Sequence, residues 1–164
     1  MSQLLNNLSS FIDEIKTYHS PIDVVLATKY ASIENIGEIT SQNKTIIFGE
    51  NRVQSGEEKQ TAYPNISNPW HFIGHLQRNK VKKVLGKYAL IHSVDSIRLM
   101  DEIEKQASTK NITSNILLQI NPLQEESKSG FSEDEIFTAI DHSKSFTNTT
   151  VTGLMVMAPL SNDI

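Results

Sequence analysis

The sequence alternates six times between a short strand-like segment and a segment with helical periodicity. The strand-like segments are rich in β-branched and apolar residues, which is typical of strands buried in a parallel sheet. Strands that alternate with helices through short connections form parallel βα units, so the chain is predicted to be an α/β protein. The expected strands cover residues 22–29, 45–48, 70–74, 90–92, 115–121 and 151–157.

Helical segments lie between these strands. An amphipathic helix is expected from Leu4 to a point before Pro21, and Ser32 stands where it can cap a second helix. Ser132 with Glu135 three residues later has the spacing of a capping box, which predicts another helix start. The remaining helices are expected over residues 53–59, 79–85 and 96–108.

Two architectures fit this alternation, an open doubly wound sheet and a (β/α)8 barrel. Neither a Gly-x-Gly-x-x-Gly nor a Gly-Lys-Ser/Thr loop follows the first strand, which removes the main support for dinucleotide or P-loop binding. A barrel needs eight strands and usually about 250 residues. The 164 residues end soon after the sixth strand, so the expectation is either an open sheet or an incomplete barrel.

Composition narrows the possible classes of function. The formal net charge of −4 argues against a general nucleic-acid-binding protein. No apolar stretch approaches the ~20 residues that cross a bilayer, and the N-terminus lacks the basic and apolar regions of a signal peptide. The chain has no cysteine, which excludes disulfides and thiolate metal sites and suits a cytoplasmic location. Hydrophobic residues make up 38%, enough for one domain with a core.

Lys29 ends the first expected strand, at the edge where parallel sheets and barrels build their active sites. A partly desolvated lysine amine there can lower its pKa and form a Schiff base with an aldehyde cofactor. The alternative is a lysine whose side chain simply extends to water. Asn51 follows the second strand and either joins the same pocket or caps the next helix. His71 in the third strand either contacts a ligand or is structural.

Three other polar clusters carry less weight. His71 and His75 lack the Glu and the uninterrupted helix of a zincin site, so no metal site is expected. The His-Ser-x-Asp stretch at 92–95 is too local to indicate a catalytic triad, whose members converge from separate positions. The loop 125–130, Glu-Glu-Ser-Lys-Ser-Gly, could hold an anion through its hydroxyls, cation and backbone amides, or could be a surface turn.

Six segments of the chain together closely resemble the YggS/PROSC family, the pyridoxal 5'-phosphate homeostasis proteins. They occur in the family's order and at its spacing across nearly the whole chain. The block Trp-His-Phe-Ile-Gly-x-Leu-Gln-x-Asn-Lys is highly specific for the family. The segments cover residues 26–29, 48–54, 70–80, 92–95, 119–130 and 153–155.

The resemblance implies a single-domain (β/α)8 barrel of the alanine racemase N-terminal-domain type, of which residues 1–164 would cover about the first six strands. It implies pyridoxal 5'-phosphate (PLP) as cofactor, with Lys29 as the Schiff-base lysine and Asn51, His71 and Met155 lining the cofactor pocket. The family is thought to bind and pass on PLP and has no established catalytic reaction. The expected protein is therefore a monomeric, cytoplasmic carrier. Its expected partners are PLP and PLP-dependent apo-enzymes, with no nucleic acid or membrane.

The chain departs from the family pattern in three places. Residues 30–32 replace the usual continuation after the lysine, and Arg52 and Ser55 stand where the family commonly has Tyr and Glu. The family's last two strands, with the loops that hold the phosphate, would follow residue 164. Two other functions therefore stay open. One is a PLP-dependent racemase or decarboxylase, which needs an opposing acid or base from a second domain. The other is a truncated chain that no longer binds PLP.

Overall fold

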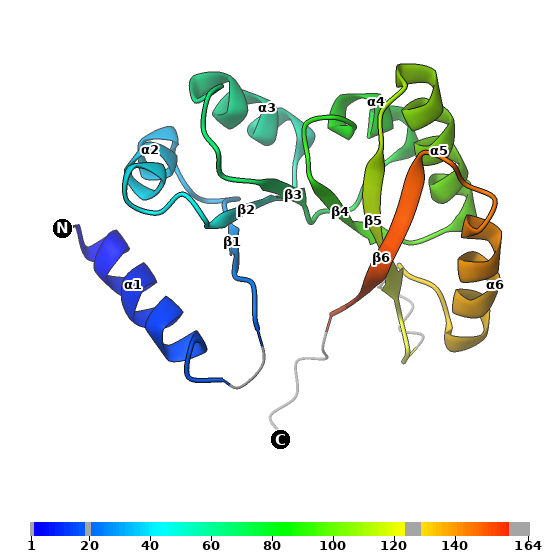
Figure 1. The fold of residues 1–164 in the computed structure, drawn as a ribbon, viewed down its shortest axis with the longest axis horizontal. Coiled ribbons are helices and arrows are strands. Elements are labelled where there is room, and N and C mark those ends of the chain that lie inside the picture. Colours follow the sequence, from blue (N-terminus) through cyan, green and yellow to red (C-terminus); the bar gives the residue numbers. More distant parts are fainter. Residues whose placement is uncertain (1, 19–20, 124–128, 158–164) are drawn as a thin grey trace. The chain divides into compact units, whose positions relative to one another are not determined.

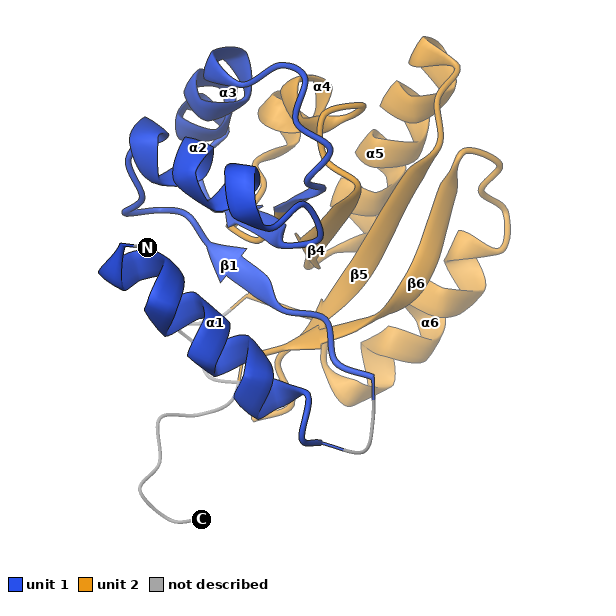
Figure 2. Ribbon diagram, turned by 60° about the vertical axis from the view of Figure 1, so that its left-hand side comes forward, with its two compact units in different colours: residues 1–71 blue, residues 72–164 orange. Residues whose placement is uncertain are grey.

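The structure is a computed structural model that describes residues 2–18, 21–123 and 129–157. Its internal contacts group the chain into two compact units, unit 1 (residues 1–71) and unit 2 (residues 72–164), which Figure 2 shows in different colours. Two such units can belong to one domain, so the single domain expected over residues 1–164 stays a prediction.

Unit 1 contains helices and strands in alternation (Figure 1). In chain order they are α1 (Gln3–Ile15), β1 (Val25–Ala27), α2 (Ile33–Gln42), β2 (Ile47–Glu50), α3 (Val53–Ala62) and β3 (Trp70–Phe72), which ends one residue past the unit boundary. The predicted cap of α2 is confirmed. Ser32 Oγ accepts the Asn35 N–H at 3.3 Å, and Asn35 Oδ1 accepts the Ser32 N–H at 3.0 Å. These bonds satisfy donors that the first helical turn leaves unpaired.

One face of the unit 1 sheet is buried and the other is more open. β1 and β2 are parallel, with Ala27 opposite Gly49. Phe48 donates its N–H to the Pro69 carbonyl at 2.9 Å, which brings the start of β3 beside β2. Phe48 and Trp70 are buried with ring centroids 5.0 Å apart, whereas Ala27 is exposed. Because side chains alternate along a strand, the residues on either side of Phe48 belong to the opposite, more open face.

Unit 2 continues the same alternation. Its elements are η1 (Arg78–Lys80), α4 (Val81–Val84), β4 (Leu90–Val94), α5 (Ile97–Lys110), β5 (Ser114–Ile120), α6 (Glu133–Ser143) and β6 (Thr149–Val156). β5 pairs in parallel with both β4 and β6. The predicted capping box of Ser132 and Glu135 is confirmed at the start of α6.

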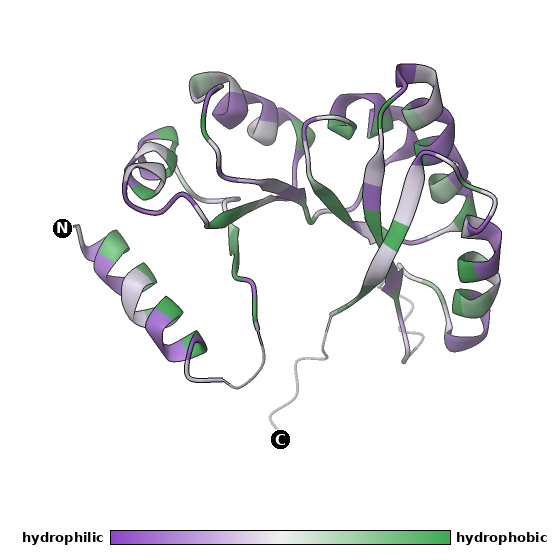
Figure 3. Ribbon diagram, in the orientation of Figure 1, coloured by the Kyte–Doolittle hydropathy of each residue, from purple (hydrophilic) through white to green (hydrophobic). Residues whose placement is uncertain are grey.

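The core of unit 2 is apolar. One stripe of α5 packs on the side chains of β5, at the spacing of a helix that buries one face. The buried apolar residues of these two elements are Leu99, Met100, Ile103, Ala107, Ile116 and Leu118. Figure 3 shows hydrophobic residues interspersed with hydrophilic ones along α5 and α6, as expected for helices with one face in water.

All registered strand pairs are parallel: β1 with β2 in unit 1, and β5 with both β4 and β6 in unit 2. This confirms the predicted series of parallel βα units. The longest helix, α5, has 14 residues, and no helix in the described ranges is long and apolar enough to cross a membrane.

Four predicted elements were wrong in their bounds. The first strand is shorter than residues 22–29, because β1 ends at Ala27 and Lys29 lies in a turn. The Thr28 carbonyl accepts Lys59 Nζ at 2.6 Å and the Ala31 N–H at 2.9 Å, so it is not available to extend the ladder. The helix expected over 79–85 is a 3-10 turn, η1, followed by the single turn of α4.

The second strand begins at Ile47 rather than at residue 45 and runs through Glu50. Asn43 Oδ1 accepts the N–H groups of Thr45 at 3.0 Å and Ile46 at 3.2 Å, and this local turn holds both residues out of the strand. The third strand, β3, ends at Phe72 rather than at residue 74. The other elements lie where they are expected, with ends moved by a few residues.

Candidate functional site

The carboxyl ends of β1 and β2 carry two of the predicted site residues. Ala27 and Gly49 form the last registered pair of this ladder, and Lys29 and Asn51 each follow that pair by two residues. The two side chains therefore leave the same edge of a parallel sheet. This is the edge at which parallel sheets and barrels bind their ligands.

Lys29 is exposed, although it directly follows Thr28, which is fully buried. Its Nζ lies 4.9 Å from the centre of the neighbouring Tyr30 ring, within the range of a cation–π contact. The amine is thus accessible to a small molecule, while the backbone beside it is fixed by buried contacts. Both properties suit a lysine that reacts with a bound aldehyde.

Asn51 and His71 belong to the more open side of the unit 1 sheet. Phe48 and Glu50 are buried on one face of β2, so the alternation assigns Asn51, the next residue, to the other face. His71 lies between the buried residues Trp70 and Phe72 and is itself only half-buried. Sequence reasoning placed both residues at a cofactor pocket, which stays a prediction.

Asn51 does not cap α3, which excludes one of its two predicted roles. The N-cap residue of α3 is Arg52, and it makes no side-chain capping bond. The Asn51 Oδ1 is buried and has no hydrogen-bond partner among the described residues. A buried amide oxygen left without a partner costs about 1–3 kcal/mol, so such atoms are usually completed by a ligand or an ordered water.

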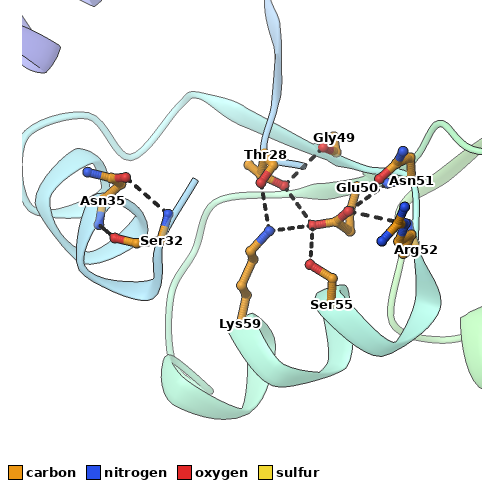
Figure 4. Close-up of polar contacts among 9 residues, drawn as sticks. All are labelled: Thr28, Ser32, Asn35, Gly49, Glu50, Asn51, Arg52, Ser55 and Lys59. Atoms are coloured by element: carbon orange, nitrogen blue, oxygen red, sulfur yellow. Dashed lines mark hydrogen bonds and ion pairs between the residues drawn. The ribbon is translucent and has the colours of Figure 1, made fainter. Parts of the chain in front are cut away.

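A cluster of charged and hydroxyl side chains surrounds the buried Glu50 carboxylate and includes Thr28, the residue before Lys29 (Figure 4). We call Thr28, Glu50, Ser55 and Lys59 the Glu50 network. Lys59 Nζ contacts Glu50 Oε2 at 2.6 Å and the Thr28 carbonyl at 2.6 Å. The hydroxyls of Thr28 and Ser55 each lie 3.1 Å from Glu50 Oε2. The side chains of Glu50 and Lys59 are 0% and 7% exposed, so water contributes little to this pair.

The second carboxylate oxygen of Glu50 binds the backbone at the start of α3. Glu50 Oε1 accepts the N–H groups of Asn51 at 2.8 Å and Arg52 at 3.3 Å. Burial by itself raises the pKa of Glu50. The bonds from Lys59, the Asn51 N–H and Ser55 outweigh this effect and hold the pKa of the Glu50 carboxyl below its usual value.

Sequence reasoning did not anticipate the ion pair of Glu50 and Lys59. Lys59 was expected only as the last residue of the helix over 53–59, and Glu50 was not among the predicted cofactor-binding residues. A weak signal was present. Ser55 and Lys59 are four residues apart and therefore share one face of α3, the face that packs on the strand carrying Glu50.

The other predicted site residue, Met155, lies on β6 of unit 2. It is half-buried and pairs in register with Gln119 of β5. Its predicted contact with the cofactor stays a prediction.

The clusters that were set aside as weak motifs are used locally. Ser93 donates its hydroxyl to the Gly74 carbonyl, and Asp95 pairs with His75 at 3.2 Å, so the 92–95 stretch does not form a triad. No group of three or more His, Asp or Glu side chains in the described ranges is arranged to hold a metal ion. Most of the loop 125–130 lies outside the described residues, so its predicted anion site stays a prediction.

Comparison with known proteins identifies the family. The family model described as "Alanine racemase, N-terminal domain" matches residues 5–163. The pyridoxal phosphate homeostasis protein of Aquifex aeolicus is 41% identical over 113 residues, which cover 69% of this chain and 50% of that protein. The one from Pasteurella multocida is 30% identical over 166 residues, which cover 100% of this chain and 71% of that protein. The match thus spans only half the length of the Aquifex relative.

Solved structures agree on the fold. PipY of Synechococcus elongatus with PLP bound has a TM-score of 0.84 and 27% identity, covering 97% of this chain and 72% of that chain. Diaminopimelate decarboxylase from Helicobacter pylori has a TM-score of 0.73 at 12% identity and shares the fold alone. The predicted fold class, an α/β parallel sheet of the alanine racemase barrel type, is confirmed. The chain belongs to the pyridoxal phosphate homeostasis proteins, within the alanine racemase N-terminal domain family.

Proposed function

We propose that this chain binds PLP, that Lys29 bonds covalently to it as a Schiff base, and that the bound cofactor is held in reserve rather than used for catalysis. The observation that carries the proposal is the position of Lys29. Lys29 is exposed beyond the carboxyl end of β1, and Lys29 and Asn51 each follow the last registered pair, Ala27 and Gly49, by two residues. The name of the Aquifex relative and the PLP bound in PipY support the choice of cofactor.

The proposed covalent bond requires only an accessible, correctly positioned amine from the protein. Lys29 would hold PLP as a Schiff base, in which a C=N bond takes the place of the aldehyde C=O bond and one water molecule leaves. When bound, PLP supplies an electrophilic ring that can withdraw electrons from attached groups. Hydrolysis of that bond would return the free aldehyde, so the same bond would serve both storage and release.

We propose that Asn51, His71 and Met155 complete the contacts to the cofactor. The side-chain amide of Asn51 has a buried oxygen without a partner, which a donor on the cofactor or on a bound water would complete. His71 lies on the same face of the sheet and is expected to contact the cofactor ring or its substituents. We propose Met155 as an apolar contact to the ring.

A carrier needs fewer groups around the cofactor than an enzyme does. Racemases and decarboxylases need an acid or base at the reacting carbon in addition to the cofactor. Tyr30 is the tyrosine nearest in sequence to Lys29, and the centre of its ring lies 4.9 Å from the Lys29 amine.

We propose that the bound PLP passes to PLP-dependent apo-enzymes and that the carrier acts as a monomer.

Titration with PLP and absorbance spectroscopy test the binding. Borohydride reduction of the mixture should fix the adduct, and peptide mapping should place it on Lys29. The Lys29→Ala variant should lose the adduct, whereas Lys44→Ala, which removes another exposed lysine of unit 1, should retain it. An adduct that persists in Lys29→Ala would contradict the assignment. The absence of any adduct in the wild-type chain would instead favour a chain that no longer binds PLP.

The competing enzymatic function has its own test. The protein with PLP is incubated with a panel of L- and D-amino acids, and racemisation and decarboxylation are followed by chiral chromatography. The carrier proposal expects rates no higher than those of free PLP. A saturable rate that disappears in both Lys29→Ala and His71→Ala would overturn it in favour of an enzyme.

A further inference from the structure

We propose that Glu50 and Lys59 are positioning residues that hold Lys29 and Asn51 in one fixed arrangement for the cofactor. This inference rests on the proposed function. Neither side chain is expected to touch PLP, because both lie buried on the face of the sheet that packs against α3. They would act through Thr28, the residue before Lys29, and through the backbone N–H of Asn51.

The Lys29 side is fixed through Thr28. The Thr28 N–H donates to the Gly49 carbonyl at 2.8 Å, and the Thr28 carbonyl accepts Lys59 Nζ at 2.6 Å. The Thr28 hydroxyl lies within hydrogen-bond distance of Glu50 Oε2 at 3.1 Å. The residue before Lys29 is therefore held by its N–H, its carbonyl and its side chain, which leaves little freedom to the point from which the reactive amine extends.

The Asn51 side is fixed by the same carboxylate. Glu50 Oε1 accepts the Asn51 N–H at 2.8 Å, while Oε2 of the same group bonds to Lys59 at 2.6 Å. The two oxygens thus divide their contacts between the segment that ends in Lys29 and the segment that begins with Asn51. Lys59 joins both sides, since it binds Glu50 and Thr28 at once.

A contribution to the stability of the fold does not by itself explain why Glu50 and Lys59 form a buried ion pair. Buried ion pairs are often replaced by apolar residues of similar volume without loss of stability, whereas removal of one partner is strongly destabilising. Directional bonds, in contrast, define where neighbouring backbone atoms lie, and apolar packing does not replace them. A positioning role therefore predicts that folding and cofactor binding respond differently when both charges are removed together.

The experiment uses double variants of the full chain. Glu50→Leu/Lys59→Met removes the pair and all its directional bonds, whereas Glu50→Gln/Lys59→Met retains an oxygen that can accept the Asn51 N–H. PLP affinity is measured by titration at a temperature where every variant is folded. The exposed pair Asp13 and Lys16, replaced as Asp13→Leu/Lys16→Met, is the matched control. It should bind PLP as the wild type does.

The positioning role predicts that Glu50→Leu/Lys59→Met folds but binds PLP on the order of tenfold or more weakly, since small misplacements of reacting groups cost this much. The Glu50→Gln/Lys59→Met variant should recover part of the affinity. If the fully apolar variant binds PLP with wild-type affinity, Glu50 and Lys59 only stabilise the fold and the inference is overturned.

A second readout separates this inference from the proposed function. Amide hydrogen exchange reports on the Thr28 and Asn51 N–H groups without any cofactor. Loss of protection at both positions in Glu50→Leu/Lys59→Met, and not in the control pair, supports the positioning role even where the wild-type chain forms no PLP adduct. Unchanged protection at both positions would overturn it. The absence of an adduct in the wild type would refute the proposed function alone.

Discussion

Glu50 of unit 1 and Glu104 of unit 2 both accept hydrogen bonds from backbone N–H groups, but their surroundings differ. Glu50 is fully buried and also pairs with Lys59 at 2.6 Å. Glu104 is only partly buried and binds the N–H groups of Thr147 and Asn148 at 2.9 and 3.1 Å. Glu104 thereby ties α5 to the turn before β6, much as Glu50 ties the ends of β1 and β2.

The difference shows what burial adds to the same interaction. In both residues burial raises the pKa, and hydrogen bonds outweigh that effect, so the pKa of each carboxyl lies below its usual value. Glu104 keeps part of its hydration and can lose a partner at small cost. Glu50 has exchanged water for protein contacts, so its charge depends on a cation being present. Glu104 in unit 2 can therefore change its hydrogen-bond partners at small cost, whereas Glu50 in unit 1 cannot.

The largest expected effect comes from breaking the buried pair. Lys59→Met should lower the free energy of unfolding by about 3–5 kcal/mol, because it leaves the Glu50 carboxylate buried without a cation. Trp70, the single tryptophan of the chain, packs against Phe48 in the same unit and reports on unfolding by its fluorescence. The Glu50→Leu/Lys59→Met variant should recover most of the loss. A Lys59→Met variant as stable as wild type would show that Glu50 is not dependent on its cation.

Acid should produce a smaller effect on the same contacts. The folded-state pKa of Glu50 lies below the reference value of 4.5, so the folded protein binds fewer protons than the unfolded chain in this range. The stability that Glu50 contributes is therefore fully present above pH 4.5 and is lost as the pH falls through the lower, folded-state pKa. Denaturant unfolding of wild type and Glu50→Gln across this range isolates the contribution. Parallel pH curves for the two proteins would refute it.

A smaller loss is expected at the partly exposed counterpart. Glu104→Gln retains an acceptor oxygen for the turn at Thr147 but loses the charge, which should cost about 1 kcal/mol. Amide exchange at the Thr147 and Asn148 N–H groups checks that the loss arises at this turn. A cost as large as that of Lys59→Met would mean that burial does not distinguish the two carboxylates.

The smallest effect is expected for a pair in water. Asp13 and Lys16 of α1 are 3.0 Å apart, and their side chains are 68% and 70% exposed. Asp13→Asn should change the free energy of unfolding by less than about 0.5 kcal/mol, because exposed ion pairs gain little over hydration. Thermal melts at low and high salt provide the measurement. A clear loss of stability would place this pair outside the ordering by burial.

Local signals in the sequence were sufficient for most of the fold. The caps at Ser32 and Ser132 were predictable because each involves residues three positions apart. The end of the first strand was not, since the Thr28 carbonyl is taken by Lys59, 31 residues further along the chain. The second strand also began late, because the side chain of Asn43 competes with the sheet for two N–H groups.

The candidate site was predicted less completely. The motifs around Lys29, Asn51 and His71 led to the correct family, and the structure agrees that Lys29 and Asn51 share one sheet edge. Periodicity could not show that Asn51 leaves the capping position to Arg52. The partnership of Glu50 with Lys59 depends on which face of α3 meets the sheet, and residue patterns over a polar helix do not specify that face.

Because one carboxylate binds both strand ends, it limits which substitutions the protein tolerates at positions 50 and 59. A single substitution at position 50 or at position 59 meets an unpaired buried charge, whereas a joint replacement by apolar residues does not. The effects of substitutions at the two positions are therefore not additive, because each single step from the charged pair to an apolar pair passes through a less stable protein.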